Sequence, residues 1–438
     1  MSLAFAVTAQ SSVCGARCGV VETAHGSFET PAFMPVGTKG TVKGIVPQLV
    51  AQTGAQIVLN NTYHLLLRPG PERVAALGGV HKFMGWGGPI LTDSGGYQAY
   101  SMADINAIDD EGVTFKSIVT GSNIRLTPEF VIEVQQQLGA DIIMAFDDCP
   151  PSVDPDAAPV NQTRIRQAAM RDSLKRKGYD HEARLDLALA RTTAWLQRCI
   201  KAHGPRGIGV GSAGPQSLFG IVQGGTDLDR RSRSVEQVCN IECPGYAIGG
   251  VAVGEQADDI ARVVRHTAPL MPADKPRYLM GVGYEHDLVA AVCAGIDMFD
   301  CVLPTRNGRN ANAFVRLDEG PDRERGRGQI RLRNSRYTDD PRPIEEDCDC
   351  PACSGSGAAW LVPEGGGGFS RAYLRHLFLA DEMLGPILVS LHNLRYFQRL
   401  MLDLRTTIAN DDWLGFARRW PRAARGLPSG VAALTRTP

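Results

Sequence analysis

The feature that most constrains the fold of this 438-residue chain is a repeated alternation between short apolar segments and helix-prone segments. The apolar segments are nearly continuous in aliphatic residues, which is typical of strands buried on both faces. They occupy residues 56–61, 88–92, 140–146, 218–222, 245–248, 277–280 and 296–299. Segments of helical period separate them, for example 71–77, 258–266 and 285–294. The alternation predicts a parallel sheet covered by helices.

Nearly every predicted strand ends in side chains suited to binding or catalysis. Asp93, Asp147 and Asp300 each follow an apolar segment, and Gln223 and the pair Gly249-Gly250 follow two others. A closed (β/α)8 barrel collects the carboxyl ends of all its strands on one reactive face. A doubly wound sheet would concentrate them at one switch point instead. We therefore expect a single TIM barrel spanning residues 1–438.

The stretch from Gly295 to Arg309 joins an acid to a basic loop. Asp300 ends an apolar segment, and Thr305, Arg306 and Arg309 follow closely. An acid with arginines just behind it suits a phosphate-bearing substrate. The alternative is structural: Asp300 caps a helix or pairs with Arg306.

Two stretches do not fit the alternation. Residues 158–214 carry more helical sequence than one crossover needs and end in a Gly-rich segment, 204–214, so we interpret them as a helical insertion with a flexible linker. Residues 316–395 contain a run of arginines, three close cysteines and a glycine tract at 365–368 that is typical of a linker. The tail from residue 424 has few large apolar side chains and is expected to be loose.

Cys348, Cys350 and Cys353 have a spacing that lets three thiolates reach one tetrahedral ion. Reduced thiols without a metal are the alternative. His376 and His392 are both candidates for a fourth ligand, and a site closed by four protein ligands is structural. The eleven cysteines, without a signal peptide or a membrane-length apolar segment, indicate reduced thiols and a cytoplasmic protein.

The overall charge gives no general attraction to nucleic acid, because the formal net charge is −1. Any such binding needs a local patch. Arginines crowd beside the cysteines at positions 316, 323, 325, 327, 331, 333 and 336. The usual explanation of such a run is a solvated, salt-bridged face. At the rim of an active face it would bind a polyanion backbone.

Several long motifs in order give a resemblance to a known family. They are Gly26-Ser-Phe-Glu-Thr-Pro-Ala-Phe-Met-Pro-Val-Gly37, Asn60-Asn-Thr-Tyr-His-Leu65, Asp93-Ser-Gly-Gly-Tyr-Gln98, Phe219-Gly-Ile-Val-Gln-Gly224, Gly249-Gly250, Asp300-Cys-Val-Leu-Pro-Thr-Arg306 and His392-Asn393. Over almost its whole length the chain resembles the tRNA-guanine transglycosylases, which exchange a base at the anticodon wobble position. The resemblance implies a (β/α)8 barrel with a zinc-binding subdomain near the C-terminus.

The resemblance also implies a role for each matching residue. Asp300 would be the nucleophile that attacks the ribose, and Asp93 the general acid and base for the ring nitrogen of the departing and arriving bases. The substrate base would be bound at its edge and faces by Asp93, Tyr97, Asp147, Gln223, Gly250 and Met280. Thr305, Arg306 and Arg309 would contact RNA. One structural Zn²⁺ would be held by Cys348, Cys350, Cys353 and His392, since the family histidine stands in a His-Asn pair.

Finer features resemble the bacterial branch of the family. Cys149 and Val253 match that branch, which inserts 7-aminomethyl-7-deazaguanine, whereas the eukaryotic branch takes queuine. Val251 replaces the leucine usual in bacteria. The implied partners are tRNAs with a G-U-N anticodon (Asp, Asn, His and Tyr acceptors) and a second copy of the chain in a homodimer. The alternatives are a non-catalytic RNA-binding paralogue, which would not need Asp93, Asp147 and Asp300 together, and a barrel hydrolase of nucleosides or sugars.

Overall fold

The computed structural model describes residues 3–97, 105–152, 154, 180–317, 328–355 and 368–434. Its centre is a closed barrel in which every strand is parallel to both neighbours. The strands are β4 (Ala32–Met34) with β5 (Val36–Gly37), then β6 (Val58–Asn60), β7 (Ile90–Thr92), β11 (Ile142–Met144), β13 (Gly214–Val222), β14 (Gly245–Ile248), β15 (Arg277–Leu279) and β16 (Met298–Asp300). The predicted fold class is confirmed.

The barrel closes through its first strand, which Pro35 divides in two. Proline has no N–H to give to a neighbouring strand, so the ladder is interrupted there. On one side β4 pairs with β16, where Asp300 lies opposite Met34, and on the other β5 pairs with β6. The Pro35 carbonyl still accepts a hydrogen bond from the Leu59 N–H at 3.0 Å.

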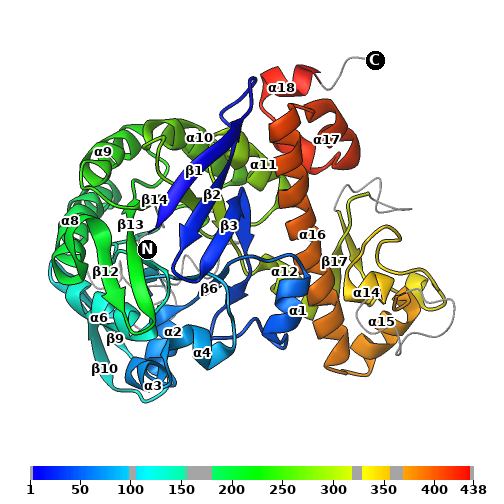
Figure 1. The fold of residues 1–438 in the computed structure, drawn as a ribbon, viewed down its shortest axis with the longest axis horizontal. Helices are drawn as coiled ribbons and strands as arrows, with labels where there is room; N and C mark the ends of the chain where they lie inside the picture. The colour runs from blue at the N-terminus through cyan, green and yellow to red at the C-terminus, as the bar shows by residue number, and fades with distance from the viewer. Residues whose placement is uncertain are drawn as a thin grey trace.

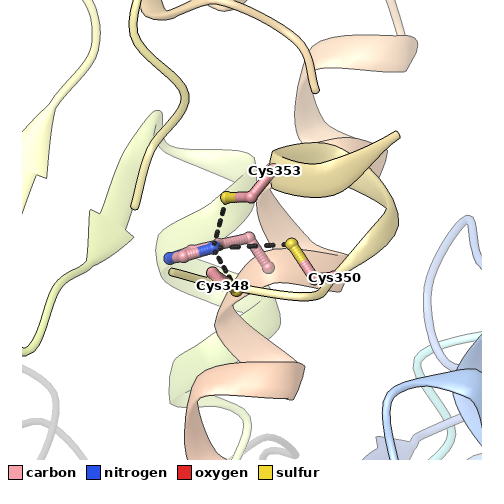
Figure 2. A group of neighbouring side chains, drawn as sticks. Cys348, Cys350 and Cys353 are labelled. Carbon is pink, nitrogen blue, oxygen red and sulfur yellow. Dashed lines mark hydrogen bonds between the residues drawn. The ribbon is translucent and has the colours of Figure 1, made fainter. Parts of the chain in front are cut away.

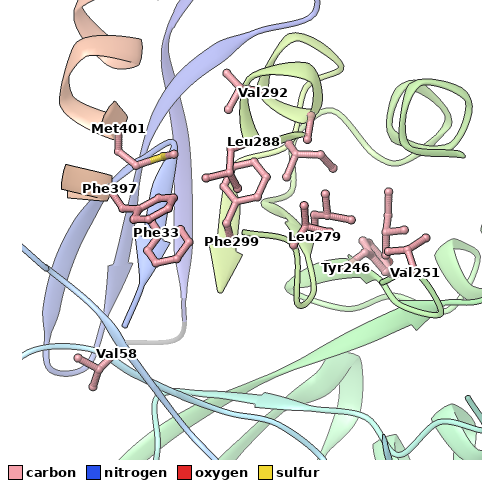
Figure 3. Packing of buried hydrophobic residues seen from close by; sticks show 14 of the residues in the cluster. Phe33, Val58, Tyr246, Val251, Leu279, Leu288, Val292, Phe299, Phe397 and Met401 are labelled. Carbon is pink, nitrogen blue, oxygen red and sulfur yellow. The ribbon is translucent and has the colours of Figure 1, made fainter. Parts of the chain in front are cut away.

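Alternate side chains along the strands fill two separate cores. Those that point inward form the barrel interior, for example Leu91, Met144 and Phe219. Those that point outward pack against the surrounding helices, and Figure 3 shows Phe33, Leu279 and Phe299 among them. The Phe33 ring stacks on Phe397 with ring centroids 4.9 Å apart. Because both faces of each strand are buried, the strands read as continuous apolar runs in the sequence.

The helices around the barrel connect consecutive strands. They are α1 (Pro47–Gln52), α2 (Thr62–Leu67), α3 (Pro71–Ala76), α4 (Gly79–Met84), α6 (Pro128–Leu138), α8 (His181–His203), α9 (Leu228–Cys239), α10 (Ala257–Thr267) and α11 (Glu285–Cys293). Helix α6 begins where the sequence predicts, because the Thr127 side chain accepts a hydrogen bond from the Phe130 N–H. Helix α6 ends at Gly139, whose φ of 78° favours glycine.

The region of the predicted insertion, 158–214, is described only from residue 180 onward. Its described helix, α8, is the element that leads from β11 to β13 and packs beside α6 and α9. The boundaries of the insertion therefore stay a prediction. The expectation of a Gly-rich linker at 204–214 is wrong for Ile208–Gly211. This segment forms strand β12 and pairs antiparallel with β13. Its glycines permit this hairpin, since a Cβ at Gly209 would lie 2.4 Å from the His203 carbonyl oxygen.

Two small antiparallel sheets lie outside the barrel. The first consists of β1 (Ala4–Gln10), β2 (Arg17–Thr23) and β3 (Gly26–Thr30), and leads directly into β4. The second consists of β8 (Ile105–Asp109), β9 (Gly112–Lys116) and β10 (Asn123–Leu126), between β7 and α6. Among the described residues, no helix is long and apolar enough to cross a membrane.

The C-terminal region follows β16 and is organised along one long helix. Figure 1 shows α16 (Leu384–Asn410) running between the barrel and a group of smaller elements. Those elements are α12 (Leu303–Arg309), β17 (Asn312–Phe314), β18 (Gln329–Arg331), α14 (Pro351–Ser354) and α15 (Arg371–Leu379). They enclose a second core that includes the three close cysteines. This arrangement agrees with a subdomain, although its predicted limits of 316–395 stay a prediction.

The expectation of a loose tail from residue 424 is wrong as far as residue 434. The turn Ala423–Gly426 packs against α11, helix α17 (Trp413–Arg419) packs against α16, and helix α18 (Ser429–Leu434) packs against α17. Leu427 and Val431 are buried. A few well-placed apolar side chains are enough to dock a short segment, which average composition does not reveal. Residues 435–438, the glycine tract 365–367 and Arg323, Arg325 and Arg327 lie outside the described residues.

Candidate active site and metal centre

The predicted site residues lie at the carboxyl ends of neighbouring barrel strands. Asp93 follows β7, Asp147 follows β11, Gln223 follows β13, Gly250 follows β14 and Asp300 ends β16. Since all these strands are parallel in one closed barrel, their carboxyl ends open on the same face. The fold therefore gathers on one face five residues that are separated by up to 207 positions in the sequence.

Asp93 is a buried carboxyl group with its own set of hydrogen-bond donors. The Thr62 N–H donates to Oδ1 at 2.9 Å, and the Asn61 side-chain amide donates to Oδ2. Burial raises the pKa of Asp93 to about 7; the Thr62 N–H opposes this shift, and the negative charge of Asp300 adds to it. A carboxyl group with a pKa near neutrality can both give and take a proton under physiological conditions.

Asp300 is anchored through one oxygen only. The Tyr278 hydroxyl donates to Oδ1 at 2.6 Å and the Gly281 N–H donates to the same oxygen at 2.8 Å. No described residue donates a hydrogen bond to Oδ2. Burial raises the pKa of Asp300, while the bond from Tyr278 lowers it. Both hydrogen bonds therefore hold the carboxylate by Oδ1 alone.

Asp147 and Gln223 form a buried pair. The Gln223 amide donates to Asp147 Oδ2 at 2.6 Å, and the Ser94 hydroxyl lies 3.4 Å from Oδ1. Burial raises the pKa of Asp147 to about 6, against the lowering effect of the Gln223 amide. The pair offers an acceptor and an amide side by side, which is the chemistry needed to read the edge of a purine-like ring.

The neighbouring acid, Asp148, is held away from this pair by α8. Arg184 donates to both of its carboxylate oxygens, at 2.6 and 2.9 Å, and Arg191 lies 3.4 Å from Oδ2. Asp148 is almost completely buried. Both arginines come from the described part of the predicted insertion, so this helix supports the loop that carries Asp147.

Gly250 is required by its backbone conformation and its surroundings. Its φ is +62°, and a Cβ there would lie 2.1 Å from the Gln223 side-chain oxygen. The buried guanidinium of Arg231, on α9, donates to the carbonyl oxygens of Gly249 at 2.8 Å and Gly250 at 2.9 Å. It also donates to the carbonyl of Val222 at 3.1 Å. Arg231 therefore fixes the backbone at the ends of β13 and β14 together.

The remaining predicted substrate contacts lie at the edge of this face. Tyr97, shortly after Asp93, is 40% exposed, and Met280, just after β15, is half-buried. Of the residues linked to base preference, Val253 is buried, and Cys149 is half-buried with its pKa raised by burial. The positions agree with a site that is open to solvent at its mouth.

The basic loop behind Asp300 forms the short helix α12. Thr305 is buried, and its hydroxyl donates to the Val302 carbonyl at 3.3 Å. Arg306 is exposed and Arg309 half-buried. Neither guanidinium forms an ion pair with a described residue. Arg316, by contrast, is engaged with Glu345 and Asp347 and is not part of a free basic patch.

The predicted metal ligands converge in the second core. Figure 2 shows the side chains of Cys348, Cys350 and Cys353 gathered around one ring nitrogen. This atom is His392 Nδ1, which lies 3.6 Å from the sulfur of Cys348, 3.6 Å from that of Cys350 and 3.3 Å from that of Cys353. Zn–S bonds of about 2.3 Å and Zn–N bonds of about 2.0 Å in a tetrahedron put S and N about 3.5 Å apart. All four residues are buried. The donor set and its spacing therefore fit one zinc ion.

The hydrogen bond at the second ring nitrogen of His392 leaves the first ring nitrogen, Nδ1, to bind a metal ion. His392 Nε2 lies 2.7 Å from the Phe314 carbonyl oxygen, so the proton belongs on Nε2 and the lone pair of Nδ1 faces the sulfur atoms. The alternative ligand, His376, is exposed on α15 and lies outside the cluster. The structure thus resolves a choice that spacing alone left open.

Three residues of the site escaped the sequence reasoning: Asn61 as the donor to Asp93, Tyr278 as the donor to Asp300, and Arg231. Asn61 ends a predicted strand, and this position at a strand end was the available signal of function. Tyr278 lies within an apolar strand and points into the barrel. The only signal in the sequence is a side-chain hydroxyl among aliphatic residues. Arg231 lies in a charged helix and has no local signal, because its partners are carbonyl groups of distant strands.

Comparison with known proteins decides the family. The family model described as queuine tRNA-ribosyltransferase matches residues 12–177 and 172–425. The chain belongs to this family. Queuine tRNA-ribosyltransferases that resemble it include those of Thermus thermophilus (46% identical over 411 residues, 94% of this chain and 92% of the relative) and Jannaschia sp. (45% identical over 405 residues, 92% and 93%). That of Nostoc sp. is 43% identical over 420 residues, covering 96% of this chain and 97% of the relative. Family membership confirms the resemblance found in the sequence and makes the chain a transferase.

Proposed function

We propose that the protein exchanges guanine at the anticodon wobble position of tRNA for 7-aminomethyl-7-deazaguanine, as a step in queuosine biosynthesis. The observation that carries this proposal is the unequal pair of carboxyl groups on one barrel face. Asp300 is fixed through Oδ1 with Oδ2 unbonded by any described residue, whereas Asp93 has its pKa raised to about 7. Two carboxyl groups whose environments differ in this way serve different roles in one reaction.

Asp300 is the nucleophile in this mechanism. Its free oxygen attacks the anomeric carbon of the ribose, so that a C–O bond forms as the bond from carbon to the guanine ring nitrogen breaks. The product is a covalent enzyme–tRNA ester. Two successive displacements at one carbon retain its configuration, as in retaining glycosidases, with a base in place of water as the final acceptor.

Asp93 handles the proton. In its neutral form it protonates the ring nitrogen of the departing guanine and becomes a carboxylate. It then accepts the proton of the incoming base as that base's nitrogen attacks the ribose anomeric carbon, so that a C–N bond forms, the C–O bond to Asp300 breaks and the Asp300 carboxylate is released. A pKa of about 7 makes both directions of transfer accessible near neutral pH.

The base is recognised by its edge and its faces. Asp147 accepts from the N–H groups of the ring, Gln223 and the Gly250 N–H donate to its carbonyl, and Tyr97 and Met280 cover its two faces. The 2.6 Å bond between Gln223 and Asp147 opens on binding, because both groups turn to the ligand. Cys149 and Val253 restrict the pocket to the smaller base, 7-aminomethyl-7-deazaguanine, and exclude queuine.

The tRNA is bound through its backbone as well as its base. Arg306 and Arg309 contact phosphates near the wobble position, and Thr305 helps to shape that contact. Support comes from the two guanidinium groups, which are close to Asp300 in the chain and form no ion pair with a described residue. The substrates are tRNAs with a G-U-N anticodon. We expect a homodimer in the cytoplasm, and the eleven free cysteines agree with a reducing compartment.

Cys348, Cys350, Cys353 and His392 hold one structural Zn²⁺ ion in the second core. With four protein ligands the ion has no open position, so it contributes to folding of the subdomain and not to the reaction. The residues of the barrel carry out the chemistry.

The first experiment follows labelled guanine into unmodified tRNA-Tyr, with a chase by unlabelled 7-aminomethyl-7-deazaguanine or by queuine. We expect incorporation, followed by displacement with the first base only. Displacement by queuine would contradict the role given to Cys149 and Val253. No incorporation by zinc-loaded protein would favour a non-catalytic RNA-binding role.

The nucleophile is tested by a matched pair of variants. Asp300→Ala should abolish both exchange and the covalent adduct with RNA on a denaturing gel. Asp93→Asn should still bind tRNA but stop turnover. A surviving adduct in Asp300→Ala, or normal turnover in Asp93→Asn, would show that the two roles are assigned wrongly.

A further inference from the structure

A cluster of two histidines and an aspartate lies at the opposite end of the barrel from the proposed active site. Asp141 directly precedes β11, His25 lies in the turn between β2 and β3, and His81 belongs to α4. Their polar atoms come within 4.8 Å of one another. Nothing in the proposed reaction uses them.

The carboxylate of Asp141 is fully engaged inside this cluster. On Oδ1 it accepts from the His25 ring at 2.7 Å and from the His25 N–H at 3.2 Å. On Oδ2 it accepts from the His81 ring at 3.0 Å and from the Ile90 N–H at 2.9 Å. Four donors satisfy the two oxygens, so each imidazole places a proton on the nitrogen that faces Asp141.

The ring geometry argues against a metal ion shared by the two histidines. The rings stack with centroids 3.7 Å apart and an interplanar angle of 19°. Lone pairs lie in the ring planes, so those of two stacked rings run side by side and do not meet at one ion. With His25 Nδ1 bonded to Asp141, Nε2 is the nitrogen left to interact with a ligand. His81 Nδ1 is shielded from solvent and has no hydrogen-bond partner among the described residues.

A cavity of about 530 Å³ opens beside this cluster. Its volume is in the usual range for small-molecule sites. It is lined by His25, Gly78, His81, Lys82, Gly85, Trp86, Gly87, Ser212 and Ala213. None of these residues is acidic. Lys82 is exposed and forms no ion pair with a described residue, and the Gly87 N–H is likewise without a hydrogen-bond partner there.

We propose that this cavity is an anion site that binds inorganic phosphate or the phosphate group of a small phosphomonoester. Lys82 supplies a full positive charge. His25 supplies an N–H from Nε2 once that nitrogen is protonated, and Asp141 behind the ring compensates the resulting imidazolium. The Gly87 N–H is a third donor. Three donors and no facing carboxylate suit a phosphate group, which accepts several charge-assisted hydrogen bonds.

The proposed anion site lies at the start of two strands that lead to the proposed active site. Asp141 directly precedes β11 and accepts a hydrogen bond from the first residue of β7, and Asp147 and Asp93 follow the other ends of these strands. A ligand that binds only the folded state stabilises it by mass action. Phosphate should therefore raise the melting temperature of the protein in a saturable manner.

Isothermal titration calorimetry with inorganic phosphate, on zinc-loaded protein in a phosphate-free chloride buffer, tests the proposal. We expect one saturable site per chain. Lys82→Met should weaken binding by about tenfold or more, which is the effect of losing one charge-assisted bond. Lys201→Met, which removes an exposed lysine on α8, should leave the affinity unchanged.

Two further variants separate binding from folding. In His25→Asn the new amide nitrogen takes the place of Nδ1 and keeps the bond to Asp141, while Nε2 is lost; binding should weaken with little change in melting temperature. In Gly87→Leu the side chain enters open space, since a Cβ at Gly87 meets no atom within 4 Å and the backbone has no positive φ. It should block binding by filling the cavity.

Several outcomes would overturn the proposal. Absence of saturable phosphate binding would do so, as would binding that both Lys82→Met and His25→Asn leave intact. Phosphate binding that Arg306→Gln abolishes would place the anion on the proposed RNA-binding face. A parallel titration with Zn²⁺ that shows a second metal ion lost in His25→Asn would replace the anion site with a metal site.

Discussion

At the scale of single residues, the two carboxyl groups of the proposed active site differ because their surroundings differ. Tyr278 and Gly281 both donate to one oxygen of Asp300, while Asn61 and Thr62 divide their bonds between the two oxygens of Asp93. Burial raises the pKa of each carboxyl group, and the negative charge of Asp300 raises the pKa of Asp93 further. These contacts support the proposed roles of Asp300 as the nucleophile and Asp93 as the acid–base group.

The raised pKa of Asp93 makes the stability of the fold depend on pH. Folding raises this pKa from about 3.9 to about 7. Between these values the folded state keeps a proton that the unfolded state has lost, so this contribution to stability is complete below about pH 4 and is lost as pH rises through 7. Asp93→Asn is neutral throughout. Relative to the wild type, its free energy of unfolding should gain up to about 4 kcal/mol between pH 4 and 8.

Thermal unfolding of both proteins at pH 5 and pH 8 measures this effect. The control is Asp274→Asn, which changes an exposed aspartate and should show the same difference from wild type at both values. A difference for Asp93→Asn that does not change with pH would mean that Asp93 is charged in the folded protein throughout this range.

At the scale of the elements, helix α9 holds two barrel strands in position through Arg231. Removal of its guanidinium in Arg231→Met leaves the carbonyl oxygens of Gly225, Gly249 and Gly250 without this donor, whereas the Val222 carbonyl keeps the bond from the Gly249 N–H. We expect a loss of about 3 kcal/mol or more in the free energy of unfolding, because several buried acceptors lose their hydrogen bonds together. The KM for the free base should rise more than the Kd for tRNA.

A second arginine on the same helix provides the control for this prediction. Arg233 is exposed and pairs with Asp186 at 2.8 Å, so Arg233→Met should cost no more than about 1 kcal/mol. Denaturant unfolding and base-exchange kinetics on both variants make the comparison. Equal effects of the two substitutions would show that Arg231 does not position the strand ends.

Helix α12 presents the proposed RNA contacts, and its contribution is electrostatic. Arg306→Gln should weaken tRNA binding at low salt and reduce the slope of log affinity against log salt by about 1, because one phosphate contact is lost. Arg418→Gln, which removes an exposed arginine on α17, should leave the slope unchanged. A filter-binding titration at several salt concentrations decides between a phosphate contact and a role within the protein.

The elements also show what the sequence could and could not predict. The barrel was predictable because strands buried on both faces carry a continuous apolar run, and because each run ends in a polar residue. The hairpin strand Ile208–Gly211 was missed, since its glycines are typical of a linker until β13 is available to pair with it. The docking of the C-terminal segment depends on contacts of residues 423–426 with α11 and on the burial of Leu427 and Val431, which have no local signature in the sequence.

For the whole molecule, the proposed zinc site and the proposed RNA-binding helix are connected through α16. His392 faces the cysteines with Nδ1 and the Phe314 carbonyl with Nε2. The next residue, Asn393, accepts from the Phe314 N–H at 2.9 Å and donates to the Pro304 carbonyl of α12 at 2.9 Å. A change at the metal centre is therefore transmitted to α12 through two adjacent side chains of one helix.

Loss of the metal should consequently impair tRNA binding as well as stability. Cys350→Ser leaves three ligands, so zinc content, measured by inductively coupled plasma mass spectrometry, should fall and the melting temperature with it. The Kd for tRNA should rise, because α12 loses part of its support from α16, while the fold of the barrel is retained. His376→Ala is the matched control, since His376 is exposed on α15 outside the cluster. Full zinc occupancy in Cys350→Ser would contradict the assigned ligation. Loss of zinc with unchanged tRNA affinity would instead show that α12 is held by its own contacts with the barrel.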